Sequence, residues 1–290
     1  MAQLQQLFDY TGHLPECPTW SEDEQALYWA DILEREIHRY RIGSGEHEVV
    51  RFPEEVGCFA LREEGGFIVA MRSAVWLSEP DGTLIQKVCD NPSNPRLARF
   101  NDGGTDRDGR FYAGTFWSLD DYNGALLVRI DNQLKTKVIQ CDIHGANGLA
   151  FSADGEWMYT SDTPNAVIYR TPLDAQGEPG NREIFRSFNA GEGIPDGAAI
   201  DEEGCYWSAL YNGWRIARFS PEGEQLAEFR LPVRCPTMVC FGGEDMKTLF
   251  ITTTRENMRP EEVAAYPLSG AIFTLPVEVA GMKKPPFRGR

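Results

Sequence analysis

Residues 194–207 read IPDGAAIDEEGCYW, and residues 145–159 read GANGLAFSADGEWMY. In both stretches an acid or amide followed by glycine begins a short apolar run. An acidic-glycine turn then leads into an aromatic strand. Asp196 and Asn147 therefore occupy the same place in two copies of one pattern. Two copies in register predict an internal repeat whose equivalent residues meet in space.

The pattern of a tight turn followed by an apolar or aromatic strand occurs six times along the chain. Each copy has a further apolar run before this strand and a second strand-like segment after it. The copies are anchored on Tyr28, Ile68, Tyr112, Tyr159, Trp207 and Phe250, at spacings of 40, 44, 47, 48 and 43 residues. A period of about 40–50 residues with roughly four strands per unit is typical of β-propeller blades. The sequence therefore predicts an all-β fold, a six-bladed β-propeller with a central channel, formed by residues 1–290 as a single domain.

Two segments near the N-terminus bear on this prediction. Residues 21–37, SEDEQALYWADILEREI, have the charge spacing of a helix, but the register of the repeat predicts a strand over Leu27–Asp31. The segment QQLFDY (5–10) lies outside the six copies. We expect it to close the ring by pairing with the last blade.

The charge of the chain limits its partners. The formal net charge is −16 over 290 residues. Nucleic acids and anionic membranes bind through patches rich in Lys and Arg, so neither is an expected partner. The composition favours a soluble protein that acts on a neutral or cation-bound small molecule, and it leaves the oligomeric state open.

The N-terminus and the cysteines predict a cytoplasmic protein. The first residues lack the basic region and apolar core of a signal peptide, and no apolar stretch approaches the roughly 20 residues that span a bilayer. The seven cysteines form no C-x-x-C pair, and their odd number predicts buried free thiols in a reducing compartment.

Equivalent positions in the repeat predict a cluster of oxygen ligands at one mouth of the channel. In a propeller the innermost strands of the blades line the channel and start at the same end. Counting back 11 or 12 residues from the anchors gives Glu16, Asn101, Asn147 and Asp196, and a count of 12 gives the apolar Val56 and Met238 in the other two blades. Carboxylate and amide oxygens suit a divalent cation such as Ca²⁺, Mg²⁺, Mn²⁺ or Zn²⁺. The alternative is that the Asn-Gly and Asp-Gly pairs are ordinary turns.

Arg99 is a further candidate at this mouth. It lies two residues before Asn101, so both side chains should face the same way along a strand. Its guanidinium could bind an anion or polarise a carbonyl, or it could pair with a nearby carboxylate. The chain has no G-x-S-x-G, Walker A or G-x-G-x-x-G motif, and Cys17, beside Glu16, has no histidine placed near it by the repeat.

Several stretches together resemble the SMP-30/gluconolactonase/luciferin-regenerating-enzyme family. They are PECPTW (15–20), YWADI (28–32), RFNDGGTDRDGRFYAGT (99–115), ANGLAFSADGEWMYTSD (146–162), IPDGAAIDEEGCYWSALYNG (194–213) and CFGGEDMKTLFITT (240–253). The segment YPLSGAIFTLPVEVAG (266–281) looks most like the bacterial sugar-lactonase branch. The resemblance covers nearly the whole chain and implies a six-bladed propeller with one divalent metal.

The resemblance implies roles for individual residues. The metal ligands of the family fall on Glu16, Asn147 and Asp196, and its substrate-contacting Arg and Asn fall on Arg99 and Asn101. Some members also place a sugar-binding Glu a few residues after the AGT segment. The stretch FWSLDDYNG (116–124) contains no Glu, and Asp120, Asp121 and Tyr122 remain alternatives.

The function that these observations predict is metal-dependent hydrolysis of an aldonolactone to the aldonic acid. Glucono-, galactono-, xylono- and arabinonolactone are the expected substrates, and Ca, Zn, Mg, Mn or Fe the expected metal. Asp196 is the expected proton acceptor for the attacking water, and Arg99 and Asn101 would orient the lactone. Two alternatives remain: a metal-dependent hydrolase of another ester or an organophosphate, and a non-catalytic Ca-binding propeller.

Overall fold

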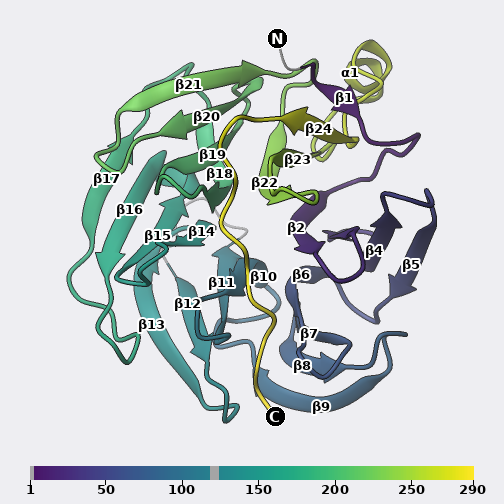
Figure 1. Ribbon diagram of the computed structural model, residues 1–290. Coiled ribbons are helices and arrows are strands. Elements are labelled where there is room, and N and C mark those ends of the chain that lie inside the picture. Colours follow the sequence, from purple (N-terminus) through teal and green to yellow (C-terminus); the bar gives the residue numbers. More distant parts are fainter. Residues whose placement is uncertain (1–2, 118–123) are drawn as a thin grey trace.

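Six four-stranded sheets stand around a central channel in the computed structural model, which describes residues 3–117 and 124–290 (Figure 1). Within each sheet every strand pairs antiparallel with its neighbour. Six such sheets in a ring confirm the predicted six-bladed β-propeller. We number the sheets as blades 1 to 6 in chain order.

The first three blades are formed by the N-terminal half of the chain. Blade 1 contains β2 (Pro15–Ser21), β3 (Ala26–Asp31), β4 (Glu36–Arg41) and β5 (His47–Arg51). Blade 2 contains β6 (Val56–Leu61), β7 (Phe67–Met71), β8 (Ala74–Ser78) and β9 (Leu84–Asp90). Blade 3 contains β10 (Ala98–Thr105), β11 (Phe111–Trp117), β12 (Ala125–Ile130) and β13 (Thr136–Ile143).

The other three blades complete the ring. Blade 4 contains β14 (Ala146–Phe151), β15 (Trp157–Asp162), β16 (Val167–Pro172) and β17 (Glu183–Ser187), with a 3₁₀ turn, η1 (Thr163–Asn165), between its middle strands. Blade 5 contains β18 (Ile194–Ile200), β19 (Tyr206–Tyr211), β20 (Arg215–Phe219) and β21 (Gln225–Arg230). Blade 6 contains β22 (Pro236–Gly242), β23 (Thr248–Thr253), β24 (Ile272–Pro276) and β1 (Gln5–Gln6), and a short helix, α1 (Pro260–Ala265), precedes β24.

Both expectations about the N-terminal region are confirmed. The segment at residues 5–6 forms β1 and pairs with β24, with Gln5 opposite Thr274, so the first residues close the last blade. The helix-like stretch contains β3, whose six residues are all buried. A strand that is buried on both faces reads as a continuous apolar run rather than an alternating one, which explains the misleading pattern.

The burial of each strand depends on its place in the blade. All seven residues of the inner strand β22 are buried, whereas the outer strand β21 of the neighbouring blade is mostly exposed. The apolar core therefore lies between the blades, and the side chains that enter the channel come from the inner strands. Among the described residues no helix is long and apolar enough to cross a membrane.

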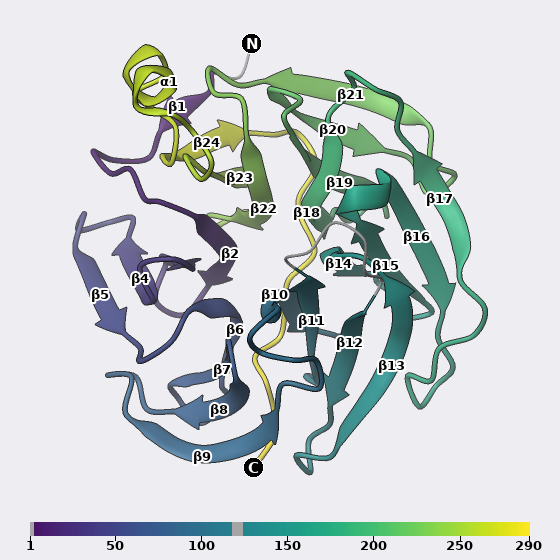
Figure 2. The same ribbon diagram turned by 180° about the vertical axis from the view of Figure 1, so that it is seen from behind.

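The last residues cross one end of the channel. Residues 281–290, which we call the C-terminal strap, run across the front of the ring in Figure 1 and lie behind it in Figure 2. Phe287 is buried, and its N–H donates to the Leu61 carbonyl at 2.8 Å. The Thr105 hydroxyl donates to the Pro285 carbonyl. The strap thus fastens onto blades 2 and 3 after leaving blade 6.

The cysteines are free thiols, as the sequence predicts, but they are not all buried. Five have buried positions, Cys89 is half-buried and Cys141 is exposed. The Cys17 Sγ lies 3.4 Å from the Phe59 carbonyl oxygen, and burial raises the pKa of this thiol to about 12. A thiol that holds its proton so tightly is no nucleophile at neutral pH.

Candidate metal centre and substrate cavity

A cavity of about 430 Å³ opens at the end of the channel opposite the strap. Its lining comes from the starts of the inner strands and the ends of the second strands. All five residues that the sequence singled out line it: Glu16, Arg99, Asn101, Asn147 and Asp196. They come from blades 1, 3, 4 and 5, so the structure brings together side chains that lie up to 180 residues apart in the sequence, from Glu16 to Asp196.

The register of the inner strands explains why counting from the anchors works. Each anchor on the second strand pairs with one inner-strand residue, and the site residue lies three positions before that partner. The pairs are Tyr28 with Thr19, Tyr112 with Gly104, Tyr159 with Ala150 and Trp207 with Ala199. The one-residue difference between the counts of 11 and 12 is therefore a difference in hairpin length, not in the position of the site residue.

The same register corrects the assignment in the other two blades. Ile68 pairs with Ala60 and Phe250 pairs with Cys240. Counting back three positions gives Gly57 and Thr237, so Val56 and Met238 are not the equivalent residues. Blade 6 therefore contributes the hydroxyl of Thr237 to the cavity, and blade 2 contributes no side chain at this position.

A β-bulge directs the site residues into the channel. In each inner strand the pairing with the second strand slips at the site position, for example between Asn147 and Ala150 and between Pro195 and Ala198. Bulges next to active sites re-aim side chains in this way. The Asn147–Gly148 pair lies inside β14 and the Asp-Gly pair lies inside β18, so the turn interpretation is wrong. Gly148 has a φ of 61°, and a Cβ there would lie 2.2 Å from Ser161 Oγ.

A one-way chain of hydrogen bonds orients the amides. The Thr163 hydroxyl donates to the Pro195 carbonyl at 2.7 Å, so its oxygen accepts from Asn147 Nδ2 at 2.8 Å. Asn147 Oδ1 accepts from Asn101 Nδ2 at 2.6 Å, and Asn101 Oδ1 accepts from Arg99 Nη1. Because a carbonyl can only accept, the direction of the whole chain is fixed. Asn147 thus presents its oxygen on the Asn101 side, with a lone pair left for a cation.

Each candidate carboxylate ligand follows a proline whose carbonyl is held by the neighbouring blade. Thr237 donates its hydroxyl to the Pro15 carbonyl at 2.7 Å, directly before Glu16. The bond to the Pro195 carbonyl does the same directly before Asp196. These two contacts hold the carboxylate-bearing strands against the preceding blades, and the repeat does not indicate which carbonyl either threonine contacts.

The two carboxylates lack the partners that buried charges need. Glu16 is 8% exposed and Asp196 is 6% exposed. Burial, followed by the negative charge of Asp196 and then Asp102, raises the pKa of Glu16 well above its ordinary value. Burial, followed by the charge of Asp102, raises the pKa of Asp196 in the same direction. Glu16 accepts one hydrogen bond, from the Cys17 N–H at 3.3 Å, and within the described part of the chain the Asp196 carboxylate accepts none.

This donor set fits a divalent cation. Burying a charged carboxylate without a partner raises the free energy of the folded protein, and a bound cation offsets that increase. Two carboxylates with the Asn147 amide oxygen are ligands that hard cations prefer. No cluster of three or more His, Cys, Asp or Glu side chains suited to a metal occurs in residues 3–117 and 124–290. The case for a cation therefore depends on the mixed carboxylate and amide set of Glu16, Asn147 and Asp196.

Arg99 faces the cavity without an ion pair. Its Nη1 donates to the Phe100 carbonyl at 3.0 Å and to Asn101, and among the described residues no carboxylate oxygen lies within salt-bridge distance. Burial lowers its pKa, and the nearby charge of Glu256 opposes this effect. The salt-bridge interpretation of Arg99 is therefore not realised, and its remaining N–H groups can donate to a ligand.

Other cavity residues are not among those that the repeat count singled out. Tyr211 ends β19, Arg72 lies in the turn after β7, and Glu256 follows β23 by three residues. Tyr211 and Arg72 each lie four residues after their anchors, Trp207 and Ile68, so the register of the hairpin could have found both. No such signal exists for Glu256, which lies six residues after Phe250. The suggested substitutes for the family glutamate, Asp120, Asp121 and Tyr122, lie outside the described residues.

Asp102 lies inside the channel, between the cavity and the strap. Its carboxylate accepts from the Gly103 N–H at 2.7 Å and from the Leu149 N–H at 2.8 Å. Burial raises its pKa to about 6. Because these bonds hold it away from the cavity lining, Asp102 is an unsuitable candidate for contact with a substrate.

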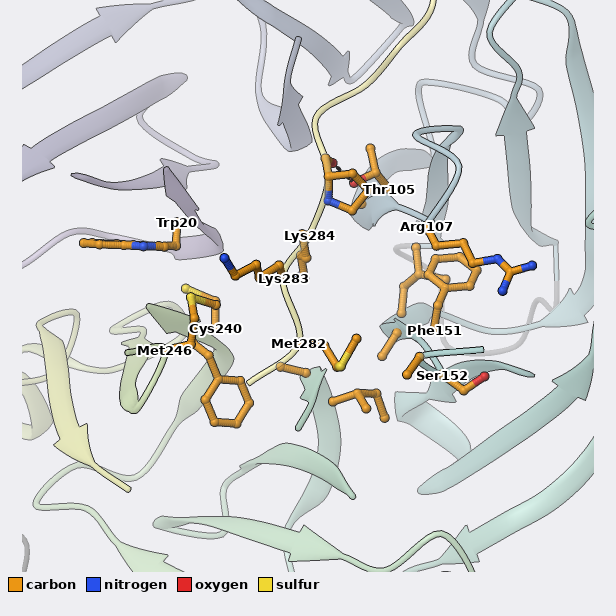
Figure 3. Close-up of a pocket in the computed structure, with 18 of the residues that line it drawn as sticks. Trp20, Thr105, Arg107, Phe151, Ser152, Cys240, Met246, Met282, Lys283 and Lys284 are labelled. Carbon is orange, nitrogen blue, oxygen red and sulfur yellow. Dashed lines mark hydrogen bonds between the residues drawn. The ribbon is translucent and has the colours of Figure 1, made fainter. Parts of the chain in front are cut away.

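The opposite end of the channel has a different lining (Figure 3). A small cavity of about 80 Å³ and a larger one of about 650 Å³ lie beside the strap, and Lys284 lines both. In Figure 3 Lys284 sits where the strap crosses the ring, and the tip of Lys283 points toward Trp20. Lys283 pairs with Glu22 at 2.5 Å.

This chain is similar to known proteins in both its sequence and its fold. The chain matches the SMP-30/gluconolactonase/LRE-like region over residues 14–255. It is 51% identical over 277 residues to 6-deoxy-6-sulfogluconolactonase of Pseudomonas putida, with 95% of each chain covered. It is 32% identical over 291 residues to regucalcin of Sus scrofa, with 96% of this chain and 95% of regucalcin covered. The crystal structure of the calcium-binding protein regucalcin from Agrobacterium tumefaciens superposes with a TM-score of 0.93 at 28% identity, covering 99% and 98% of the two chains.

Proposed function

Since the chain belongs to the SMP-30/gluconolactonase/LRE-like family, we propose that it hydrolyses a sugar lactone to the open aldonic acid with the help of one divalent cation. One observation carries the proposal. A single cavity holds two buried carboxylates that form no ion pair among the described residues and, beside them, an arginine with free donors. The likeness to a sulfogluconolactonase at 51% identity supports the lactone substrate.

Glu16, Asn147 and Asp196 would hold the cation. When bound, it supplies Lewis acidity toward the lactone carbonyl. The regucalcin of Agrobacterium tumefaciens is a calcium-binding protein, and the likeness to it supports Ca²⁺ as one candidate. A site of hard oxygen ligands also accepts Mg²⁺, Mn²⁺, Zn²⁺ or Fe²⁺, so the metal has to be determined by reconstitution.

Asp196 is the proposed proton acceptor. As water attacks the carbonyl carbon, one of its protons passes to the Asp196 carboxylate. The bond between the carbonyl carbon and the ring oxygen then breaks, and the proton returns to that oxygen as it becomes a hydroxyl. The Asp196 carboxylate suits this role because no residue in the described part of the chain hydrogen-bonds to it, which leaves its oxygens for water and cation.

Arg99 and Asn101 have different proposed roles toward the substrate: Arg99 donates hydrogen bonds to it, and Asn101 positions Arg99. Both amide hydrogens of Asn101 are used, toward Asn147 Oδ1 and the Ala146 carbonyl. Asn101 therefore offers a substrate only acceptor capacity on Oδ1 and mainly positions Arg99. The free N–H groups of Arg99 are the proposed donors to the developing oxyanion.

The substrate is an aldonolactone, and a lactone with an anionic substituent at C6 is the first to test. The name of the Pseudomonas relative supports 6-deoxy-6-sulfogluconolactone. Two arginines, Arg72 and Arg99, line the cavity, which also suits an anion. Neutral glucono-, galactono-, xylono- and arabinonolactone complete the panel.

Hydrolysis should be measured by proton release on chelator-stripped protein that is reconstituted with each cation in turn, with a blank for spontaneous opening. We expect acceleration that requires a divalent cation and is restricted to one or a few lactones. Turnover of an ester or organophosphate but of no lactone would replace the proposal with the other hydrolase class. Tight cation binding without any turnover would support the alternative of a non-catalytic, cation-binding propeller.

A further inference from the structure

We infer that Arg72 is a specificity-determining residue that receives an anionic substituent of the lactone, such as a sulfonate, phosphate or carboxylate, at the end of the sugar remote from the ring carbonyl. This inference deepens the proposed function and rests on it. Arg72 lines the same cavity as the candidate cation ligands but comes from blade 2, which contributes no oxygen ligand.

The Arg72 side chain is held rigidly. Its Nε and Nη2 bond to the two carboxylate oxygens of Glu55, and its Nη1 donates to the Pro95 carbonyl at 3.0 Å. Its backbone is also fixed, because its N–H donates to the Glu55 carbonyl and its own carbonyl accepts from Asn91 Nδ2. Ordering this long side chain on binding therefore costs little further entropy.

The guanidinium still has donors to offer. Three of its five N–H groups are bonded among the described residues, and the side chain is 36% exposed. The unbonded N–H groups belong to Nη1 and Nη2, which form the planar end of the fork. That end matches two oxygens of a sulfonate, phosphate or carboxylate.

The charges around the cavity favour an anion on this side. Glu16, Asp196 and Glu256 carry three negative charges, and Arg72 and Arg99 carry two positive ones. A divalent cation would bring the lining to a net charge of about +1. The positive groups come from blades 2 and 3, whereas Glu256 follows β23 in blade 6. An anionic substituent would therefore be attracted toward blades 2 and 3.

Arg99 alone does not provide this attraction. It is already proposed to serve the carbonyl end of the lactone, and it is bonded to Asn101. Both guanidinium groups line the same cavity. Burial lowers the pKa of Arg99, the charges of Glu256, Glu16 and Glu55 oppose this effect, and the charge of Arg72 lowers the pKa further. Glu55 accepts hydrogen bonds from Nε and Nη2 of Arg72, and the N–H groups that remain unbonded are available to a ligand in the cavity.

The competing role is a purely structural Arg72–Glu55 ion pair. It is tested by measuring kcat and KM of Arg72→Met, Arg72→Lys and the control Arg96→Met on 6-deoxy-6-sulfogluconolactone and on neutral gluconolactone. Arg96 is exposed on the connection between β9 and β10, directly after the Pro95 that Arg72 contacts, and it does not line the cavity. Thermal melting of each variant monitors folding.

We expect Arg72→Met to raise KM for the sulfonated lactone about 10- to 100-fold and to leave KM for the neutral lactone within about 3-fold, because only the sulfonated lactone loses a charge-assisted hydrogen bond. Arg72→Lys should recover only part of the loss, and Arg96→Met should behave as wild type. Calorimetry with the non-reacting product, the sulfonated acid, should show the same loss of affinity.

Equal losses on both lactones in a folded variant, or no loss on either, would overturn the inference. If Arg72→Met fails to fold, Arg72→Lys gives the same comparison with the charge retained and the fork removed. Wild-type protein that hydrolyses the neutral lactone but shows no preference for the sulfonated one refutes this inference alone. Protein that hydrolyses neither lactone refutes the proposed function itself.

Discussion

The two ends of the channel are made from the same repeated strands but are completed in opposite ways. At the strap end the chain supplies its own closure, since Phe287 is buried, backbone bonds join the strap to blades 2 and 3, and Lys284 faces the channel. At the other end Glu16 and Asp196 are buried without a protein cation paired to either among the described residues. Charge that the protein leaves uncompensated marks the end where a ligand completes the structure.

The difference follows from where each end lies on the strands. The site end carries the bulges of the inner strands, where a local break in pairing turns polar side chains inward. At the strap end the inner strands pair regularly with the second strands, with residues such as Gly104 and Phe241 beside the cavity. The slip at the site end occurs in all six inner strands, so the repeat itself turns one position of every blade toward the channel, and the residue type at that position decides whether it can serve as a ligand.

The substitution with the largest expected effect on this comparison is Asp196→Ala at the site end. We expect cation binding to be lost and kcat/KM to fall by at least about 10³-fold, because the change removes both a ligand and the proposed proton acceptor. The fold should persist, since the change removes an uncompensated buried charge. Activity and calorimetric cation titration provide the measurements.

Arg99→Ala is the matched control, since it lies in the same cavity and is not a proposed ligand. It should lower kcat/KM about 10- to 100-fold while cation affinity stays within about 3-fold of wild type. Full activity of Asp196→Ala would contradict the proposed site, and loss of the cation in Arg99→Ala would mean that the ligand set is wrong.

The corresponding test at the strap end is Phe287→Ala. Phe287 is 1% exposed and packs against Phe111, so truncation should cost about 3–5 kcal/mol of unfolding free energy. Arg290→Ala, at an exposed strap residue, should stay within about 0.5 kcal/mol. Chemical denaturation of both variants gives the comparison. A Phe287→Ala variant as stable as wild type would show that the strap adds nothing to the core.

A third test uses the group between the two ends, Asp102, in cation-free protein. Its folded pKa of about 6 exceeds its ordinary value of 3.8. The folded state therefore binds more protons in this window, and stability should rise as the pH falls from 7 to 5, by about 1 kcal/mol from this group. The Asp102→Asn variant should lose that part of the rise. An unchanged pH dependence in the variant would mean that Asp102 is not the titrating group.

The fold and the cavity positions of Glu16, Asn101, Asn147 and Asp196 could be predicted from the sequence for one physical reason, and Arg99 follows from its place two residues before Asn101 in the same strand. Buried aromatic anchors such as Tyr159 and Trp207 fix the register of each hairpin, and the site residue lies three positions before the partner of the anchor. The anchor spacing of 40–48 residues therefore predicts both the six blades and the positions of the site residues on the inner strands. The count fails by one residue where the hairpin length differs, which is why Val56 and Met238 are not the equivalents that it predicts.

The rest of the cavity lies partly within reach of the same register. Arg72, Thr163 and Tyr211 each lie four residues after an anchor, so their places could have been counted. Glu256 lies six residues after Phe250, beyond the end of β23, and the register does not give its place. Contacts between blades, such as the bond from Thr163 to the Pro195 carbonyl, depend on how one blade packs on the next, and no periodicity within a blade encodes such a contact.

The last test, for which we expect the smallest effect, is whether a charge at the strap end changes cation binding at the site end. Lys284 is half-buried on the strap, and no ion pair to it occurs among the described residues. Its charge nonetheless lowers the pKa of groups in three blades, Cys17, Asp102 and Cys240, although burial dominates for each of them. Its ammonium group therefore acts along the channel axis, toward the acidic interior.

Replacing this lysine should strengthen cation binding at the far end. Lys284→Met removes a positive charge that repels the cation through the channel, an effect of roughly 0.5–1 kcal/mol at an intermediate effective dielectric constant, or about 2- to 5-fold in affinity. Lys283→Met removes the same charge from a side chain that pairs with Glu22, and it should change affinity by less than about 1.5-fold. Calorimetric cation titrations at two salt concentrations compare the variants. Equal affinities in both would mean that the channel screens one end from the other. A gain restricted to Lys284→Met and reduced by salt would mean that the strap, while closing one end, also sets how tightly the other end holds its cation.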